Sequence, residues 1–353
     1  AFLILEDGTV FTGTSIGSTK SVISEIVFNT SMTGYLEVLT DPSYAGQAVV
    51  MTYPLIGNYG VTPDMESAQP WPDGYIVREL SRIPSNFRCQ GTIQDFLKEH
   101  DIPGIAGIDT RALTKILREK GTMNGMITTD ENYKLDEILP QLHVYNTGNV
   151  VDKVTCSEKK VLKADGYKVA LLDFGAKNNI AQSLHKRGCE VTIYPAHTTA
   201  EEILSSDPDG IMLSNGPGDP KACTDIIKEV KKLYDSEVPI FAICLGHQLM
   251  ALATGADTYK LKYGHRGGNH PVKDLETGRV YISSQNHGYA VDADSLDQAV
   301  AVPAFTNVND GTNEGLKYTG KNITVQFHPE ACPGPQDSGY LFDKFIEMMG
   351  GQK

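Results

Sequence analysis

From residue 167 onward, short apolar segments alternate with segments of helical pattern, and this alternation constrains the fold more than any other feature of the chain. The apolar segments include KVALLDF, EVTIYP, GIMLSNG and PIFAIC, and helical patterns of roughly 10 residues follow them. Continuous apolar strands that alternate with helices are typical of a parallel sheet covered by helices on both faces. We therefore predict a doubly wound α/β domain over residues 167–353, with a mainly parallel sheet.

Residues 1–145 lack that alternation and show a mixed pattern instead. The segment LILEDGTVFTG predicts a hairpin that turns at its Asp-Gly pair, where glycine supplies a positive φ. The segments TIQDFLKEHDI and DTRALTKILREKG predict helices, the second with Asp109 or Thr110 as N-cap and Gly121 just beyond its end. We predict an α+β domain with a β-rich core. Residues 146–166 lose periodicity and gain charge, which predicts a linker between two domains.

Composition limits the partners and the compartment of the protein. A length of 353 residues is enough for two domains with separate cores. The net charge of −13 argues against nucleic acid as a partner. The longest apolar runs, such as Ile240 to Leu245, are too short to span a membrane, and the N-terminal AFLILEDG predicts no signal peptide. Six cysteines without a CxxC pair favour free thiols and a cytoplasmic protein.

Three unusual sequences follow strands of the predicted α/β domain. They are SNGPGDP at residues 214–220, Cys244, and HPE at residues 328–330. In an open α/β sheet, ligands bind outside the carboxyl ends of the strands. We therefore expect these three sequences to lie along one edge of the sheet and to form a binding or catalytic site.

Cys244 lies where an apolar strand passes into a helix. The N-terminus of a helix places partial positive charge beside the thiol and favours the thiolate. Its small neighbours Ala242 and Gly246 allow the sharp strand-to-helix bend of a nucleophile elbow. These features are compatible with a catalytic nucleophile, and a buried cysteine without a catalytic role is the alternative.

A cysteine nucleophile needs a base that a third group orients. His247 is nearest in sequence, but its own helix holds it away from the thiol. His328 and Glu330 fit better, because side chains at i and i+2 of one strand point to the same face. Glu330 would then fix the tautomer of the imidazole. A turn with two solvated polar residues is the alternative for this segment.

Gly216 and Gly218 lie in the loop after another predicted strand. Glycine lets backbone amides approach a ligand closely. The loop contains no basic residue and no GxxxxGK[ST] pattern, so a phosphate site is one interpretation and an oxyanion hole shared with the amide of Leu245 is the other.

His265 and His270 of GHRGGNHP could suggest a metal site. They lack cysteine or carboxylate partners at ligand spacing, so we predict no metal site and no cofactor in this chain. Cys332, two residues beyond Glu330, is expected to be a small packing residue.

Taken together, the motifs resemble known families. CLGHQ, SNGPGDP, SQNHGYAV and QFHPE, in this order, are similar to the class I (triad) glutamine amidotransferase domain. LEDGTVFTG, GYLEVLTDPSYAGQ, TYPLIGNYG, SNFR and GIDTRALTKILREKG resemble the small subunit of carbamoyl phosphate synthetase, so the resemblance covers essentially the whole chain.

The resemblance implies a glutaminase that hydrolyses L-glutamine through a glutamyl-thioester. Ammonia would pass to the carbamoyl phosphate synthetase large subunit, which makes carbamoyl phosphate from bicarbonate and ATP for pyrimidine and arginine biosynthesis. ATP and Mg are therefore expected in the partner of this heterodimer and not in this chain.

The resemblance also implies residue roles, with Cys244 as nucleophile, His328 as base and Glu330 as its orienter. The residues that it implies for binding the oxyanion or glutamine are Ser43, Gly216, Gly218, Leu245, Gln248, Asn286, Gly288 and Tyr289. Ser43 belongs to the N-terminal domain, so both domains would contribute to one site. Ala242 stands where many relatives have glycine and Tyr289 where phenylalanine is frequent, and both are compatible with these roles.

Three other functions compete with this interpretation. Amidotransferases for anthranilate, aminodeoxychorismate or guanylate synthesis resemble only residues 167–353. A non-catalytic regulatory subunit has no need to retain the cysteine, histidine and glutamate together. A stand-alone cysteine hydrolase leaves the N-terminal domain unexplained.

Overall fold

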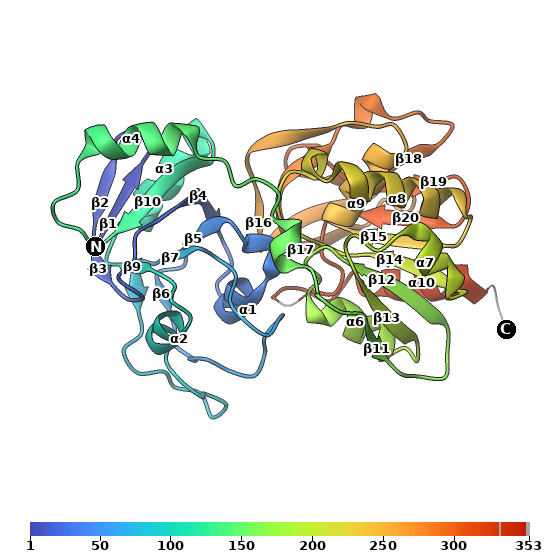
Figure 1. Cartoon of the computed structure of the whole chain (residues 1–353), viewed down its shortest axis with the longest axis horizontal. Coiled ribbons are helices and arrows are strands. Elements are labelled where there is room, and N and C mark those ends of the chain that lie inside the picture. Colours follow the sequence, from blue (N-terminus) through green and yellow to red (C-terminus); the bar gives the residue numbers. More distant parts are fainter. Residues whose placement is uncertain (332, 351–353) are drawn as a thin grey trace. The chain divides into compact units, whose positions relative to one another are not determined.

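The chain forms two compact units, Ala1–Thr147 and Gly148–Lys353 (Figure 1). The structure, a computed structural model, describes residues 1–331 and 333–350, so Cys332 lies outside the described residues. Within these ranges no helix is long and apolar enough to cross a membrane.

The first unit is built on a mixed sheet of eight strands in the order β2-β1-β10-β4-β5-β7-β9-β3. The strands of this sheet are β1 (Phe2–Leu5), β2 (Val10–Thr12), β3 (Thr14–Ser15), β4 (Val22–Asn29), β5 (Gln47–Met51), β7 (Gly74–Ile76), β9 (Gly104–Ala106) and β10 (Met123–Thr128). The remaining elements are the strand pair β6 (Leu55–Ile56) and β8 (Glu79–Leu80), the helices α1 (Tyr35–Thr40), α2 (Ile93–Glu99), α3 (Thr110–Lys120) and α4 (Leu135–Val144), and a 3-10 helix at Pro42–Tyr44. The predicted α+β domain with a β-rich core is confirmed.

Local signals in this unit act as the sequence predicts. β1 and β2 form the antiparallel hairpin, and Gly8 in its turn has a φ of 84°. Asp109 is the N-cap of α3, and its Oδ1 accepts a hydrogen bond of 3.0 Å from the amide of Ala112. Gly121 ends the same helix with a φ of 103°, a conformation that side chains rarely adopt.

The second unit contains a sheet of ten strands in the order β11-β13-β12-β14-β15-β20-β19-β18-β16-β17. Its strands are β11 (Lys160–Leu162), β12 (Lys168–Asp173), β13 (Glu190–Pro195), β14 (Gly210–Leu213), β15 (Ile240–Ile243), β16 (Thr258–Asp274), β17 (Val280–Val291), β18 (Ala301–Asn307), β19 (Asn313–Tyr318) and β20 (Asn322–Val325). The five strands from β13 to β20 in this order run parallel, and the other neighbours pair antiparallel. The doubly wound class is therefore confirmed, with an antiparallel extension.

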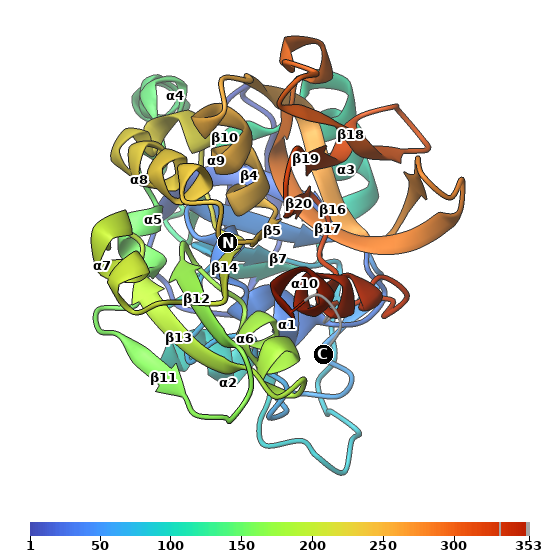
Figure 2. The same cartoon turned by 90° about the vertical axis from the view of Figure 1, so that its right-hand side faces the viewer.

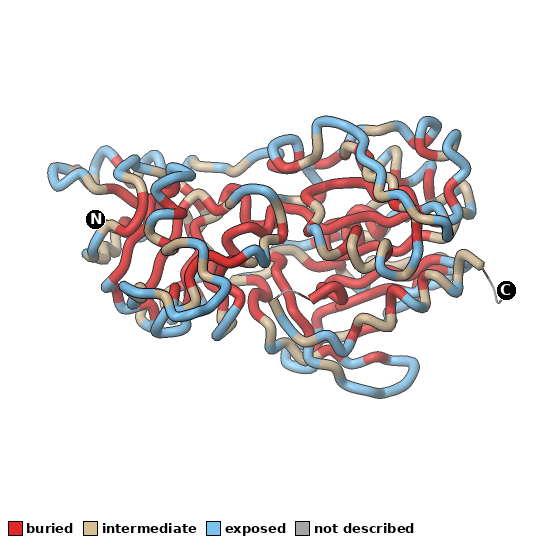
Figure 3. The backbone as a smooth tube through the Cα atoms, turned by 90° about the horizontal axis from the view of Figure 1, so that it is seen from below, coloured by how far each residue is buried: buried red, intermediate tan, exposed pale blue. Residues whose placement is uncertain are grey.

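Helices cover both faces of this sheet (Figures 1 and 2). They are α5 (Val151–Val154), α6 (Asn178–His185), α7 (Ala200–Ser205), α8 (Thr224–Asp235), α9 (Leu245–Ala253) and α10 (Tyr340–Gly350), with 3-10 helices at Pro220–Ala222 and Ala293–Ser295. One buried cluster joins the sheet to α7, α8 and α9, and a second joins it to α6 and α10. Buried residues, red in Figure 3, lie in the interior of each unit, and exposed residues lie around them.

Residues 146–166, for which the sequence predicts a linker, contain α5 and β11. β11 pairs antiparallel with β13 at the edge of the ten-stranded sheet. The segment is short and rich in lysine, and the side chains of β11 are exposed or only partly buried, so its periodicity is weak in the sequence.

The core between the sheet and α10 allows a test of packing. Phe241 is fully buried in β15, and its ring contacts Phe342 edge-on with centroids 5.4 Å apart. Phe241→Ala should destabilise the second unit by about 3–5 kcal/mol, because it removes the apolar contact and leaves a cavity. Its thermal transition should fall by at least roughly 6 °C. Val302→Ala on the half-exposed face of β18 is the matched control and should have little effect. Equal transitions for the two variants, measured by calorimetry, would contradict this packing.

Candidate active site

Cys244 occupies a strained turn between β15 and α9. Its φ is 53° and its ψ −106°, a conformation that residues other than glycine rarely adopt. The turn packs tightly, because a Cβ on Gly246 would lie 2.5 Å from the carbonyl oxygen of Leu213. Strain of this kind persists only where the surrounding structure holds it. The thiol is thus fixed at the N-terminus of α9, where backbone amides have no helical acceptor.

His328 and Glu330 lie beyond the end of β20. The strand stops at Val325, so the expectation that both residues lie on one strand is wrong; His328 forms an isolated bridge with Ser284, and Glu330 lies in a turn. Pro329 lacks an amide to continue the ladder. Even so, the two side chains meet, with His328 Nδ1 2.7 Å from Glu330 Oε1. Because the carboxylate accepts this hydrogen bond, Nδ1 donates it and Nε2 is the nitrogen left for chemistry.

Lys177 completes a buried chain of charges that the sequence did not reveal. Its Nζ donates to Glu330 Oε1 at 3.0 Å and to the carbonyl oxygen of Ala331 at 2.8 Å, and both charged side chains are buried. Lys177 follows β12, so it reaches the same edge of the sheet as Cys244 and His328. A lysine in the loop directly after a parallel strand, in FGAKNN, was the signal that could have identified it.

The charges around His328 determine its protonation state. Burial opposes a charge on the ring, but the Glu330 carboxylate outweighs it and raises the pKa of His328 well above the usual range, with a smaller contribution from the nearby Cys244 thiol. Burial also opposes ionisation of Glu330, yet the ammonium of Lys177 and the imidazolium lower the pKa of this carboxyl group. His328 is therefore a charged imidazolium at neutral pH.

His247 has a structural environment. It is fully buried in α9, and its Nδ1 lies 2.7 Å from the hydroxyl of Thr324 in β20. Burial lowers the pKa of His247 to about 3, so it is neutral under ordinary conditions. This hydrogen bond ties the ring to a strand and not to the thiol, which agrees with the preference for His328.

The glycine loop lies beside the elbow. A Cβ on Gly216 would be 2.2 Å from the carbonyl oxygen of Phe174 and 2.8 Å from Leu245 Cδ2, so only glycine fits there. Gly218 has a φ of 92°, and a side chain at this position would contact Val150. The structure thus places Gly216 against Leu245, the residue that follows the thiol.

A second group of predicted residues gathers along β17. Gln248 Nε2 donates to the carbonyl oxygen of Tyr289 at 2.8 Å and to Gln326 Oε1 at 2.9 Å. The thiol of Cys244 lies 3.6 Å from the carbonyl oxygen of Asn286. Gly288 lies between these residues on the same strand. These backbone carbonyls give the segment the polar groups that a bound amide would need.

Ser43 belongs to the first unit. It is buried in the 3-10 helix Pro42–Tyr44, where its amide donates to Asp41 Oδ1 at 2.9 Å. Its contribution to a glutamine site stays a prediction.

Comparisons with known proteins identify the family. The model for the carbamoyl-phosphate synthase small chain, CPSase domain, matches residues 3–127, and the model for class-I glutamine amidotransferase matches residues 170–348. The carbamoyl phosphate synthase small chain of Listeria monocytogenes serotype 4b is 52% identical, with 99% of this chain and 97% of that one covered. That of Clostridium perfringens is 51% identical, with 98% and 99% covered. This chain belongs to the carbamoyl phosphate synthase small chain family.

Family membership decides between the competing functions. The match over residues 3–127 excludes an amidotransferase for another acceptor and a stand-alone hydrolase, because neither explains this region. The chain is a glutamine-hydrolysing enzyme subunit of the carbamoyl phosphate synthase type. The crystal structure of a glutamine amidotransferase from Thermotoga maritima has 20% sequence identity and a TM-score of 0.39, covering 47% of this chain and 77% of that one.

The buried contacts of Glu330 with Lys177 and His328 lead to a spectroscopic prediction. In selectively ¹⁵N-labelled protein, His328 should remain protonated through neutral pH. Glu330→Gln should move its pKa from above to below the ordinary value of about 6.5, because the two largest remaining influences, burial and the charge of Lys177, both lower the pKa and outweigh the Cys244 thiol, which raises it. His247 is the internal control in the same NMR spectra and should stay neutral in both proteins. A His328 resonance that titrates identically in the two proteins would mean that Glu330 does not control it.

Proposed function

We propose that Cys244, His328 and Glu330 hydrolyse L-glutamine as a catalytic triad and that the ammonia passes to the carbamoyl phosphate synthetase large subunit. The observation that carries the proposal is the conjunction of a thiol in a strained elbow with a buried imidazole that Glu330 holds at 2.7 Å. This arrangement of nucleophile, base and orienting carboxylate is the general requirement for acyl transfer by a cysteine.

In the first half-reaction, the Cys244 thiolate attacks the carboxamide carbon of glutamine. The amides of Gly216 and Leu245 donate hydrogen bonds to the oxyanion that develops on the carbonyl oxygen, and Gly218 lines the same loop. The imidazolium of His328 then gives its Nε2 proton to the departing nitrogen. The carbon–nitrogen bond breaks, ammonia leaves, and a glutamyl-thioester remains on Cys244.

In the second half-reaction, neutral His328 accepts a proton from a water molecule through Nε2. The hydroxide equivalent attacks the thioester carbon, the carbon–sulfur bond breaks, and glutamate leaves with the thiolate restored. Glu330 stays ionised throughout and stabilises the imidazolium each time it forms. Lys177 supports this role, since it keeps a negative charge on Glu330 favourable inside the protein.

Glutamine recognition falls to polar groups around the elbow. The substrate is held by the side chain of Gln248 and by the backbone of Asn286, Gly288 and Tyr289. The hydrogen bond that Gln248 already donates to the Tyr289 carbonyl preorients these groups. By the resemblance alone, we assign to Ser43 a hydrogen bond with the part of glutamine that does not react.

The rest of the synthesis belongs to the partner. Thiol chemistry of this kind needs no metal or organic cofactor, and we assign ATP, Mg and the activation of bicarbonate to the large subunit. The product, carbamoyl phosphate, supplies pyrimidine and arginine biosynthesis. All five described cysteines are free thiols, which fits a reducing cytoplasmic compartment.

Cys244→Ser tests the division of labour in the reconstituted two-subunit complex. Glutamine-dependent synthesis of carbamoyl phosphate should fall by on the order of 10³-fold or more, because a hydroxyl is far less acidic than a thiol. Synthesis from added ammonium should be nearly unchanged. Both rates are measured by a coupled assay for carbamoyl phosphate.

The matched control is Cys156→Ser, which changes a partly exposed cysteine of the same unit and should preserve both activities. Loss of the ammonium-dependent reaction in Cys244→Ser would overturn the ammonia-donor role. Retention of the glutamine-dependent reaction would overturn Cys244 as the nucleophile.

Ser43→Ala tests the contribution of the first unit to substrate binding. A hydrogen bond to a non-reacting part of glutamine contributes about 0.5–1.5 kcal/mol, so KM should rise by roughly 2- to 10-fold with kcat little changed. Ser85→Ala, at an exposed position of the same unit, is the control. Steady-state glutaminase kinetics that match for the two variants would remove Ser43 from the pocket.

A further inference from the structure

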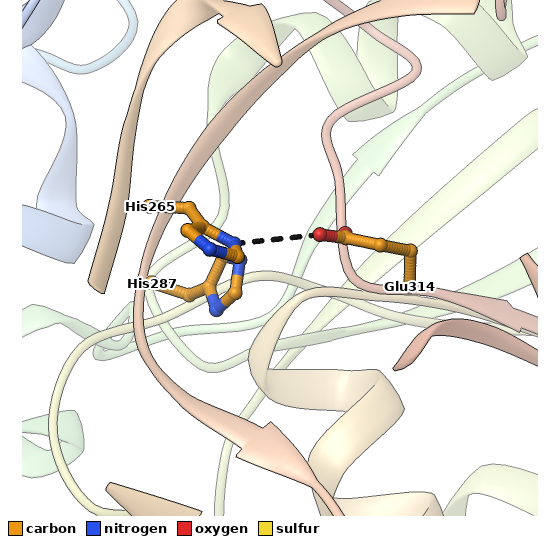
Figure 4. Close-up of side chains that lie close together, drawn as sticks. All are labelled: His265, His287 and Glu314. Atoms are coloured by element: carbon orange, nitrogen blue, oxygen red, sulfur yellow. Dashed lines mark ion pairs between the residues drawn. The ribbon is translucent and has the colours of Figure 1, made fainter. Parts of the chain in front are cut away.

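His265, His287 and Glu314 form a buried cluster on the antiparallel part of the second unit's sheet. His265 of β16 and His287 of β17 are direct cross-strand partners, and the register of this strand pair shifts on both sides of His265. Glu314 comes from β19 and faces both rings, as Figure 4 shows. One ligand atom from each residue lies within 4.8 Å of the other two. Cross-strand pairing and irregular register thus bring three metal-binding side chains together.

The hydrogen bonds leave one nitrogen of each ring available. His287 Nδ1 donates to the carbonyl oxygen of Tyr289 at 2.8 Å, which leaves Nε2 with a lone pair. His265 Nε2 lies 2.8 Å from Asp310 Oδ2, which leaves Nδ1 facing Glu314. Both rings therefore have a hydrogen-bond acceptor on the nitrogen that points away from the cluster, as metal-binding histidines almost always do.

Glu314 has an acceptor without a partner. Its Oε1 accepts a hydrogen bond of 2.9 Å from Asn307 Nδ2, but its fully buried Oε2 has no hydrogen-bond partner among the described residues. Gln285 Oε1 lies 3.1 Å from His287 Nε2 and adds another acceptor. Several acceptors that face one another in a buried space need a proton or a cation between them.

The spacing between two of the three ligand atoms matches a tetrahedral ion. His265 Nδ1 and Glu314 Oε1 are 3.4 Å apart, and two ligands of one zinc ion with bonds of about 2.0–2.1 Å lie roughly 3.3–3.4 Å apart. Two imidazoles and one carboxylate favour a transition metal over Mg²⁺ or Ca²⁺, which prefer oxygen ligands. We propose that His265, His287 and Glu314 bind a Zn²⁺ ion, with a fourth position left for water or Gln285.

An ion bound at this site would also affect the rest of β17, the strand that carries His287. His287 lies between Asn286, whose carbonyl oxygen contacts the Cys244 thiol, and the Gly288–Tyr289 segment. A bound ion fixes this segment by its own bonds to His287. This consequence for glutamine binding rests on the proposed function, whereas the metal site itself does not.

A proton is the competitor of the ion. Burial opposes a charge on His265, but the carboxylates of Glu314 and Asp310 raise its pKa, so a proton on the ring is the alternative to the ion. The other groups around it are the neutral rings of His270 and His287 and the guanidinium of Arg266, which opposes any added positive charge.

The test measures metal and not activity. The full chain is stripped with a chelator and titrated with Zn²⁺ against a chromophoric competitor, and Co²⁺ then serves as a spectroscopic probe. We expect one Zn²⁺ per chain and Co²⁺ bands of a tetrahedral nitrogen–oxygen set. The intense thiolate charge-transfer band that Cys244 or another cysteine would produce should be missing.

Variants locate the site. Glu314→Gln keeps an oxygen for Asn307, and His265→Gln removes one imidazole; each should weaken Zn²⁺ binding on the order of 100-fold or more. Asp310→Asn should weaken it by about 10- to 100-fold, because it removes only the carboxylate that orients the His265 ring. His197→Gln is the matched control, since His197 forms an exposed pair with Asp152 in the same unit.

Several outcomes would overturn the site. They are the lack of a bound ion in the wild-type chain, equal affinity in Glu314→Gln and His197→Gln, and a Co²⁺ spectrum with thiolate bands. Thermal unfolding of each metal-free variant shows whether it folds, and retention of the Zn²⁺-induced rise in Tm by a folded Glu314→Gln protein would also contradict the proposal. Glutaminase activity is assayed separately, so its loss would test the proposed function and not the metal site.

Discussion

The ion pair between Lys177 and Glu330 supports the rest of the active site. Both groups are buried, and an unpaired carboxylate in such a place would take up a proton and lose its charge. Removing one partner of a buried pair typically costs about 3–5 kcal/mol. The oxygen that accepts from Lys177 also lies against His328. A single carboxylate oxygen therefore connects the loop after β12 to the imidazole and sets the charge and orientation of the proposed base.

The order of strands in the sheet places the reacting groups next to one another. β14, β15 and β20 are parallel neighbours, and β12 adjoins β14, so four loops emerge along one edge. The proposed nucleophile, Cys244, has a positive φ of 53°. Ala331, three residues after the proposed base His328, has a positive φ of 55°. Backbone strain of this kind costs on the order of 1–3 kcal/mol per residue. The packed sheet supplies the rigidity that holds it.

β17 lies against the Cys244 thiol and also contributes a side chain to the cluster of His265, His287 and Glu314. The carbonyl oxygen of Ser284 accepts from the amide of His328 at 2.9 Å, and that of Asn286 lies near the Cys244 thiol. One residue further, His287 points into the cluster with His265. Alternate residues of a strand face opposite sides of the sheet, so β17 can border the candidate active site and also contribute His287 to the proposed metal site.

The sequence by itself determined the two-part fold class, the hairpin and caps of the first unit, and the alternation of strands and helices in the second. These features depend on local periodicity and on residues such as Asp109 and Gly121, whose effects act within a few positions. It also singled out Cys244 and His328 through motifs at strand ends. Only the tertiary structure decided that Lys177 pairs with Glu330, that His328 lies beyond its strand, and that His265 meets Glu314. These contacts join segments far apart in the chain, and strand order and register, which no local pattern encodes, bring them together.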